Sequence, residues 1–119
     1  MLRILSLCTL ILLAFGAHAG GARWQMLMVE SPGCPFCRQF RAEILPSYAA
    51  HPQGRAAPLL HVDFDGPWPN GLALASRPRV TPTFILLEGG KEIGRIEGYP
   101  GREAFWPAVA EMLQDAEAR

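Results

Sequence analysis

The chain has 119 residues, which is room for one domain. Half of its residues are hydrophobic and its formal net charge at pH 7 is zero. This balance is typical of a globular domain, and without an excess of basic residues we expect no nucleic acid among its partners. The three cysteines are an odd number, which needs an explanation.

Residues 1–19 have the pattern of a cleaved secretory signal peptide. A short basic start precedes a run of apolar residues, and AHA at 17–19 has the small residues of a cleavage site. The apolar run is shorter than the about 20 residues that a membrane-spanning helix needs, so we expect no stable membrane anchor. Cys8 leaves with this segment. Residues 20–119, the expected mature domain, then keep two cysteines in an oxidising compartment.

Strands and helices are predicted to alternate along the mature segment. Apolar runs and alternating patterns predict strands at residues 24–30, 57–65, 81–88 and 91–99. Apolar residues at helical spacing predict helices at 35–50, with a kink or an end at Pro46, and at 100–118. The stretch 72–76 is predicted to form one or two helical turns, and 51–55 a loop.

The order of these elements predicts an α/β fold. It is a β-α-β unit followed by β-β-α, with Gly89 and Gly90 as the turn of the final hairpin. The first crossover should be right-handed and pair parallel strands, whereas the hairpin adds an antiparallel strand. We therefore expect a central mixed four-stranded sheet with helices on both faces.

Cys34 and Cys37 form a C-x-x-C motif that follows a strand and opens a helix. Free N–H groups and the positive end of the helix dipole favour a thiolate at the first cysteine and lower its pKa. Cys34 is therefore the expected nucleophile, and Cys37, one turn further on, can resolve a mixed disulfide. Pro35 stiffens the turn, and Phe36 places apolar surface beside the sulfur. This chemistry needs no cofactor.

Other interpretations of the cysteine pair stay open on spacing alone. A zinc site needs four ligands, but the two histidines of the mature segment, His51 and His61, have no matching spacing. A structural disulfide across so short a loop would remove little chain entropy. A redox-idle binding module and a copper or zinc carrier are the alternatives of a different functional class, although a carrier would need further soft ligands. No metal site is predicted.

Three motifs resemble the thioredoxin superfamily. They are CPFC after the first strand, VTPTF at 80–84 before the third, and GYPGREAF at 98–105 before the last helix. The resemblance implies a thioredoxin-like fold and a cis peptide bond between Thr81 and Pro82, facing the cysteine pair. It also implies that Thr81 and Pro82, with Pro35 and Phe36, contact the substrate.

The runs ESPGCPFCRQFRAEI and RIEGYPGREAFW look more narrowly like the SoxS-type thioredoxin-like proteins of bacterial sulfur-oxidation operons. That resemblance implies a periplasmic thiol reductant that acts as a monomer on the cysteine of a sulfur-carrier protein and is recharged by a membrane thiol donor. A disulfide oxidant or isomerase is the alternative within the same chemistry. Isomerases of this type carry an added dimerisation domain, for which this chain has no length.

The sequence departs from thioredoxin at the position of a buried aspartate, which Met28 occupies here. Glu30 has the same strand parity as Met28, so it is a possible proton acceptor for the pair. The alternative is that Glu30 is the solvated end of its strand. The residue before the cis proline is threonine, as in periplasmic disulfide isomerases, rather than isoleucine. These departures leave redox direction and partner choice open.

Overall fold

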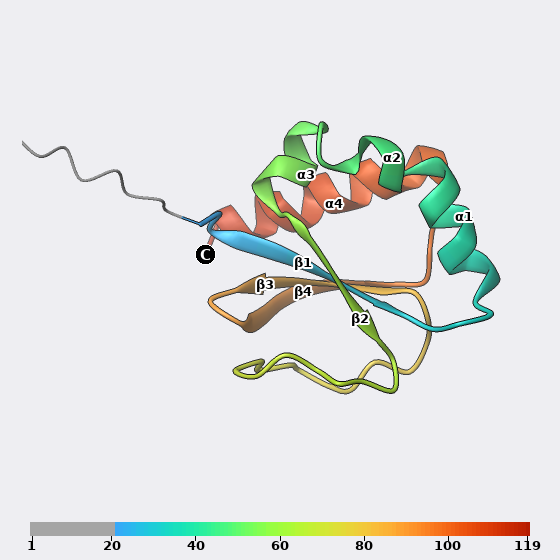
Figure 1. Cartoon of the computed structure of the whole chain (residues 1–119). Coiled ribbons are helices and arrows are strands. Elements are labelled where there is room, and N and C mark those ends of the chain that lie inside the picture. Colours follow the sequence, from blue (N-terminus) through green and yellow to red (C-terminus); the bar gives the residue numbers. More distant parts are fainter. Residues whose placement is uncertain (1–20) are drawn as a thin grey trace, which may run out of the picture.

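The computed structural model describes residues 21–119, so the expected signal peptide and its cleavage point lie outside the described residues (Figure 1). The strands are β1 (Trp24–Glu30), β2 (Leu59–Asp63), β3 (Thr83–Glu88) and β4 (Lys91–Glu97). The helices are α1 (Pro35–Glu43), α2 (Leu45–Tyr48), α3 (Pro52–Ala56) and α4 (Arg102–Glu117). No helix within residues 21–119 is long and apolar enough to cross a membrane.

The four strands form one mixed sheet in the order β2-β1-β3-β4. β1 pairs parallel with β2, whereas β1–β3 and β3–β4 are antiparallel. The two central strands are covered on both faces, which agrees with their near-continuous apolar sequences. The predicted α/β class, the mixed four-stranded sheet and the parallel first pair are therefore confirmed.

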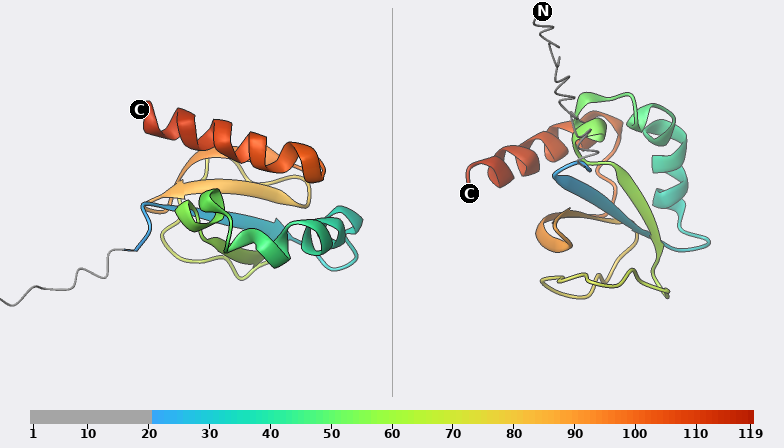
Figure 2. Two further views of the ribbon diagram at one scale, coloured as in Figure 1. Left: turned by 90° about the horizontal axis from the view of Figure 1, so that it is seen from above. Right: turned by 60° about the vertical axis from the view of Figure 1, so that its left-hand side comes forward.

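The helices lie on one face of the sheet only, so the expectation of helices on both faces was wrong. Alternate side chains of β1 point to opposite faces. Met26 and Met28 pack with Phe40 of α1 and Phe105 of α4 in one core cluster. Figure 1 shows α1–α4 together above the sheet, and Figure 2 shows the same layering from two further directions.

The opposite face is covered by the irregular segment 64–82. Leu27 and Val29 of β1 point to this face, where Trp68, Leu72 and Leu74 pack against their cluster. The predicted helical turns at 72–76 do not form. The segment contains four prolines and two glycines, residues 66, 67, 69, 71, 78 and 82, which disfavour helix. Ala73 instead pairs with Lys91 at the start of β4.

Prolines also set the helix boundaries near the site. α1 ends at Glu43, and Pro46 lies in the first turn of α2, so the predicted break is confirmed. The stretch predicted as a loop at 51–55 is largely helix α3. His51 caps it, because its ring nitrogen Nδ1 accepts the N–H of Gln53 at 3.2 Å, and Pro52 occupies the first turn.

Candidate active site around Cys34 and Cys37

The cysteine pair lies where the central strand β1 leads into α1 (Figure 1). A turn joins the two elements, and the N–H of Cys34 donates to the carbonyl of Ser31 at 3.4 Å. Gly33 has φ +74°, a backbone conformation that favours glycine. Cys34 is the N-cap of α1, and Pro35 follows in the first turn, where its missing N–H costs nothing.

Cys34 and Cys37 are joined by a disulfide, with 5.2 Å between their Cα atoms. The Sγ of Cys34 accepts the backbone N–H of Cys37 at 3.1 Å. This is the contact that would hold a thiolate at the free end of the helix once the pair is reduced. Cys34 is 6% exposed and Cys37 is fully buried, so Cys34 is the less buried of the two. The geometry suits an attacking and a resolving thiol.

An aromatic cluster packs beneath the pair. The ring of Phe40 lies 4.8 Å from Phe84 and 5.3 Å from Phe105, centroid to centroid. Tyr99 contacts Phe40 edge-on at 5.9 Å and donates its hydroxyl to Glu43 at 3.2 Å. Burial, together with the hydrogen bond and the charge of Glu43, raises the pKa of Tyr99 to about 12. The cysteines therefore rest on a packed apolar base.

The peptide bond between Thr81 and Pro82 is cis, as the resemblance to the thioredoxin superfamily implied. The Oγ atoms of Thr81 and Ser31 lie 3.0 Å apart and share a hydrogen bond, which ties this loop to the turn before Cys34. The carbonyl of Pro82 accepts the N–H of Gly98 at 2.8 Å. The structure therefore brings Thr81 and Pro82 to the same end of the sheet as the cysteine pair.

Glu30 points to the helix-covered face, but its carboxylate is already paired. One oxygen lies 3.1 Å from Arg41 of α1, and the other lies 3.1 Å from the Nδ1 of His61 on β2. The partners of the Glu30 carboxylate within residues 21–119 are thus Arg41 and His61, and neither cysteine is among them. Met28, in the position of the thioredoxin aspartate, is fully buried in the core cluster that holds both cysteines. No group of three or more potential metal-binding side chains occurs within residues 21–119.

Two large apolar side chains in residues 21–119 are exposed, and both flank this region. Phe36 is 57% exposed on the first turn of α1, in line with the expected apolar surface beside the sulfur. Val80 is 45% exposed two residues before Pro82. The sequence analysis missed Val80, because a lone valine in an irregular segment carries no periodic signal.

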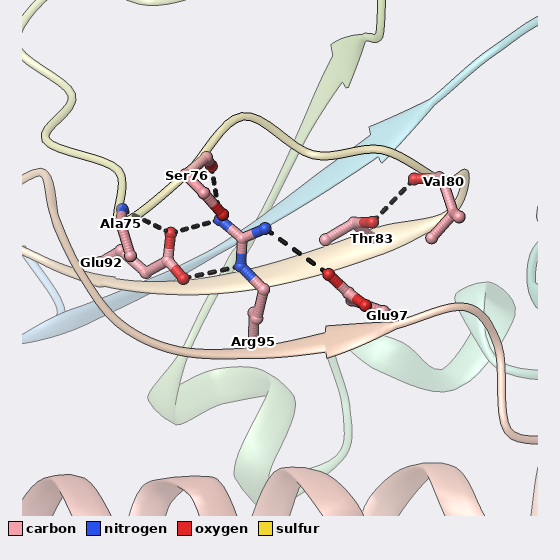
Figure 3. Close-up of polar contacts among 7 residues, drawn as sticks. All are labelled: Ala75, Ser76, Val80, Thr83, Glu92, Arg95 and Glu97. Atoms are coloured by element: carbon pink, nitrogen blue, oxygen red, sulfur yellow. Dashed lines mark hydrogen bonds and ion pairs between the residues drawn. The ribbon is translucent and has the colours of Figure 1, made fainter.

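The Glu92–Arg95 pair on β4, also missed from the sequence, holds the loop that leads to Pro82 (Figure 3). Arg95 donates to the two oxygens of Glu92 at 2.7 and 2.6 Å, and to the carbonyl of Ser76 at 2.7 Å. Glu92 also accepts the N–H of Ala75 at 3.0 Å. The pair thus joins the edge strand to the segment that covers the helix-free face.

The electrostatics of this pair follow from its contacts. Burial alone would raise the pKa of Glu92, but the hydrogen bonds from Arg95 and Ala75 and the charge of Arg95 hold that pKa below its ordinary value. The hydrogen bond to Glu92 raises the pKa of Arg95, against a smaller effect of burial. Each side chain therefore stabilises the charged form of the other.

The sheet order, the helix-capping cysteine and the cis proline at the same end of the sheet are features of thioredoxin-fold proteins with a dithiol site. The family model described as the thioredoxin-like domain matches residues 16–113. This chain therefore belongs to the thioredoxin-like domain family. A comparison with curated proteins found no match.

Among solved structures, the chain is similar to the reduced form of the periplasmic thioredoxin SoxS from Paracoccus pantotrophus. The two are 45% identical, with a TM-score of 0.76 over 78% of this chain and 98% of that one. The resemblance to SoxS-type proteins is therefore confirmed. Fasciola hepatica thioredoxin is 17% identical, with a TM-score of 0.54 over 76% of this chain and 82% of that one, which shows the fold alone.

Proposed function

We propose that this chain is a periplasmic thiol–disulfide oxidoreductase that reduces cysteines of another protein. The observation that carries the proposal is the position of Cys34. Its Sγ caps α1 and accepts the Cys37 N–H at 3.1 Å, and Cys34 is the less buried member of the pair. A thiolate stabilised in this way is the nucleophile of disulfide exchange.

In the proposed reaction the Cys34 thiolate attacks one sulfur of the partner's disulfide. The partner's disulfide breaks, a mixed disulfide to Cys34 forms, and the leaving sulfur takes up a proton. Cys37 then loses its proton and attacks the Cys34 sulfur, which releases the second partner thiol and forms the Cys34–Cys37 disulfide. Two electrons pass to the partner, and the pair ends in the oxidised form that the structure shows.

The substrate chain is proposed to lie across Thr81 and Pro82, with Pro35 and Phe36 on the other side of the disulfide. Pro82 has no N–H of its own and its carbonyl is bonded to Gly98. The exposed ring of Phe36 offers apolar surface to an incoming chain. Neither the Pro82 backbone nor the apolar ring of Phe36 requires a particular side chain in the substrate. The reactive cysteine of the partner is then the feature that this surface recognises.

We propose the reducing direction because no charge lies between the cysteines. A strong oxidant has a reduced form stabilised by a very low thiol pKa. Phe36 has no charge to add to the helix dipole. A reductant in the periplasm must be recharged, which implies a membrane thiol donor. The similarity to the periplasmic thioredoxin SoxS supports this location, and by the SoxS-type resemblance the partner is a sulfur-carrier protein.

The test is a covalent trap. In a Cys37→Ser variant the mixed disulfide at Cys34 cannot be resolved, so a partner protein should accumulate on Cys34 in periplasmic extracts and be released by dithiothreitol. Cys34→Ser is the matched control, since it keeps one thiol but removes the less buried one. Equal trapping by the two variants, or trapping by neither, would contradict the proposed roles.

The proposal includes export and removal of residues 1–19, after which the domain works as a monomer. The pattern at 17–19 places the new N-terminus at or next to Gly20. An intact-mass measurement on protein from the periplasmic fraction checks this, because a mature chain that retains Cys8 would disprove cleavage there.

A further inference from the structure

The segment 77–82, which the Thr81–Ser31 hydrogen bond ties to the turn before Cys34, is held at both ends. At its start, the Glu92–Arg95 pair binds the backbone of Ala75 and Ser76 (Figure 3). At its end, the Thr83 hydroxyl donates to the carbonyl of Val80 at 2.7 Å. These bonds hold the backbone of the segment 77–82 at both ends. We call this segment the platform.

A cavity of about 210 Å³ opens between this platform and the turn before Cys34. Its lining consists of Ser31, Phe64, Arg79 and Thr81. Ser31 lies three residues before Cys34, and Thr81 precedes the cis proline. The cavity therefore adjoins the turn that leads into Cys34.

The polar groups of the cavity are donors that favour an anion. Arg79 is exposed, and within residues 21–119 it has no acidic partner, whereas Arg41 and Arg95 are both paired with glutamates. The hydroxyls of Ser31 and Thr81 share one hydrogen bond, which uses one of their two protons. One hydroxyl proton and the planar guanidinium of Arg79 can thus bind a carboxylate together.

We propose that this cavity binds the carboxylate of an aspartate or glutamate next to the reactive cysteine of the partner protein. The inference rests on the proposed function, because the partner's cysteine must meet Cys34. Arg79 is then a specificity residue, and the exposed side chains of Phe36 and Val80 contact apolar atoms of the same partner segment. The cavity selects among partners, whereas the dithiol carries out the exchange.

The test compares disulfide-linked peptides that differ in one residue beside the cysteine, which is Glu, Gln or Lys. The protein is reduced with dithiothreitol, freed of it, and mixed with each peptide in a single-turnover measurement of the second-order rate constant. Reduction of the same peptides by dithiothreitol gives their intrinsic reactivity, by which each rate constant is divided. For the wild type, the Glu peptide should be favoured over the Gln peptide about three- to five-fold, as for a partly exposed ion pair.

Arg79→Met should bring this ratio close to one. Arg77→Met is the matched control, because Arg77 lies on the same segment, carries the same charge and contacts the ring of Phe64 at 5.9 Å without lining the cavity. Its ratio should stay near that of the wild type. Higher salt should reduce the preference of the wild type, since screening weakens exposed charge pairs.

Equal corrected rates for the Glu and Gln peptides with the wild type would overturn the inference and leave the proposed function standing. A loss of preference in Arg77→Met as large as that in Arg79→Met would also overturn it, because a general charge effect would then replace a site. If the reduced wild type reduces none of the peptides, the proposed function is wrong, and this inference fails with it.

Discussion

Replacement of Arg95 by methionine should lower the free energy of unfolding by about 2 kcal/mol. Methionine keeps an apolar stem but removes both bonds to Glu92 and the bond to Ser76. In this variant the Glu92 carboxylate keeps a single partner, the N–H of Ala75. Because the Glu92 side chain is only 7% exposed, water cannot easily replace the lost bonds. A hydrogen bond to a charged group contributes about 1.5–3 kcal/mol. Because the three bonds of Arg95 belong to one network, their contributions are not additive, and we expect a loss close to that of a single bond.

Urea and thermal unfolding of Arg95→Met measure this effect. For a domain of this size, about 2 kcal/mol corresponds to a melting temperature lower by about 10 °C. Arg23→Met is the matched control, because Arg23 also pairs with a strand glutamate, Glu88, but both side chains are exposed. It should cost less than about 0.5 kcal/mol. A double-mutant cycle with Glu92→Gln isolates the coupling between the two charges.

The pH dependence of this difference has a defined sign. The pKa of Glu92 in the folded protein is below its ordinary value of 4.5, so its stabilisation is complete above that value and is lost as the pH falls through the folded pKa. The gap between wild type and Arg95→Met should therefore narrow in acid. A gap that is independent of pH, or no larger than that of Arg23→Met, would refute the assignment of the Glu92–Arg95 pair as the anchor of the loop.

Further predictions concern the cysteine pair and the packing of α4. In the reduced protein, alkylation at mildly acid pH should label Cys34 before Cys37, and equal labelling would reverse or remove the role assignment. Equilibration with glutathione should give a potential of roughly −270 to −200 mV, and a value above about −150 mV would favour an oxidant. Gly94→Ala should cost about 1–2 kcal/mol by overpacking, because the added Cβ would lie 2.6 Å from the Cγ of Met112. In a Met112→Ala background the clash is absent, so the double variant Gly94→Ala/Met112→Ala should have nearly the same free energy of unfolding as Met112→Ala alone. Urea unfolding curves of the three variants measure this.

The sequence predicted the parts of the fold that depend on local patterns. The apolar run at 24–30 indicated β1 at its observed bounds, and the helical spacing after Pro35 indicated where α1 begins, although the predicted helix extended beyond the observed end at Glu43. The helix-free face was not predictable in the same way. The apolar residues of segment 64–82 are there because they pack against a sheet face, and a leucine that packs from an irregular segment has no period to read.

The candidate site shows the same division. The roles expected of Cys34 and Cys37 came from two neighbouring elements, a strand end and a helix start. Glu30 was placed on the correct face from strand parity, but its pairing with Arg41 and His61 depends on chain segments that meet only in the fold. The same holds for Arg95 and Ser76, which lie 19 residues apart. Contacts of this kind leave no spacing that a single sequence reveals.

The one-sided arrangement of the helices separates two kinds of evolutionary constraint. Cys34 and Cys37 belong to the core cluster on the helix-covered face, whereas the segment that leads to Arg79 and Val80 packs on the opposite face. A substitution or a change of length in 64–79 can therefore alter the surface offered to a partner without repacking the helix that holds the nucleophile. Related proteins could diverge in their partners along this segment while they keep the same redox chemistry.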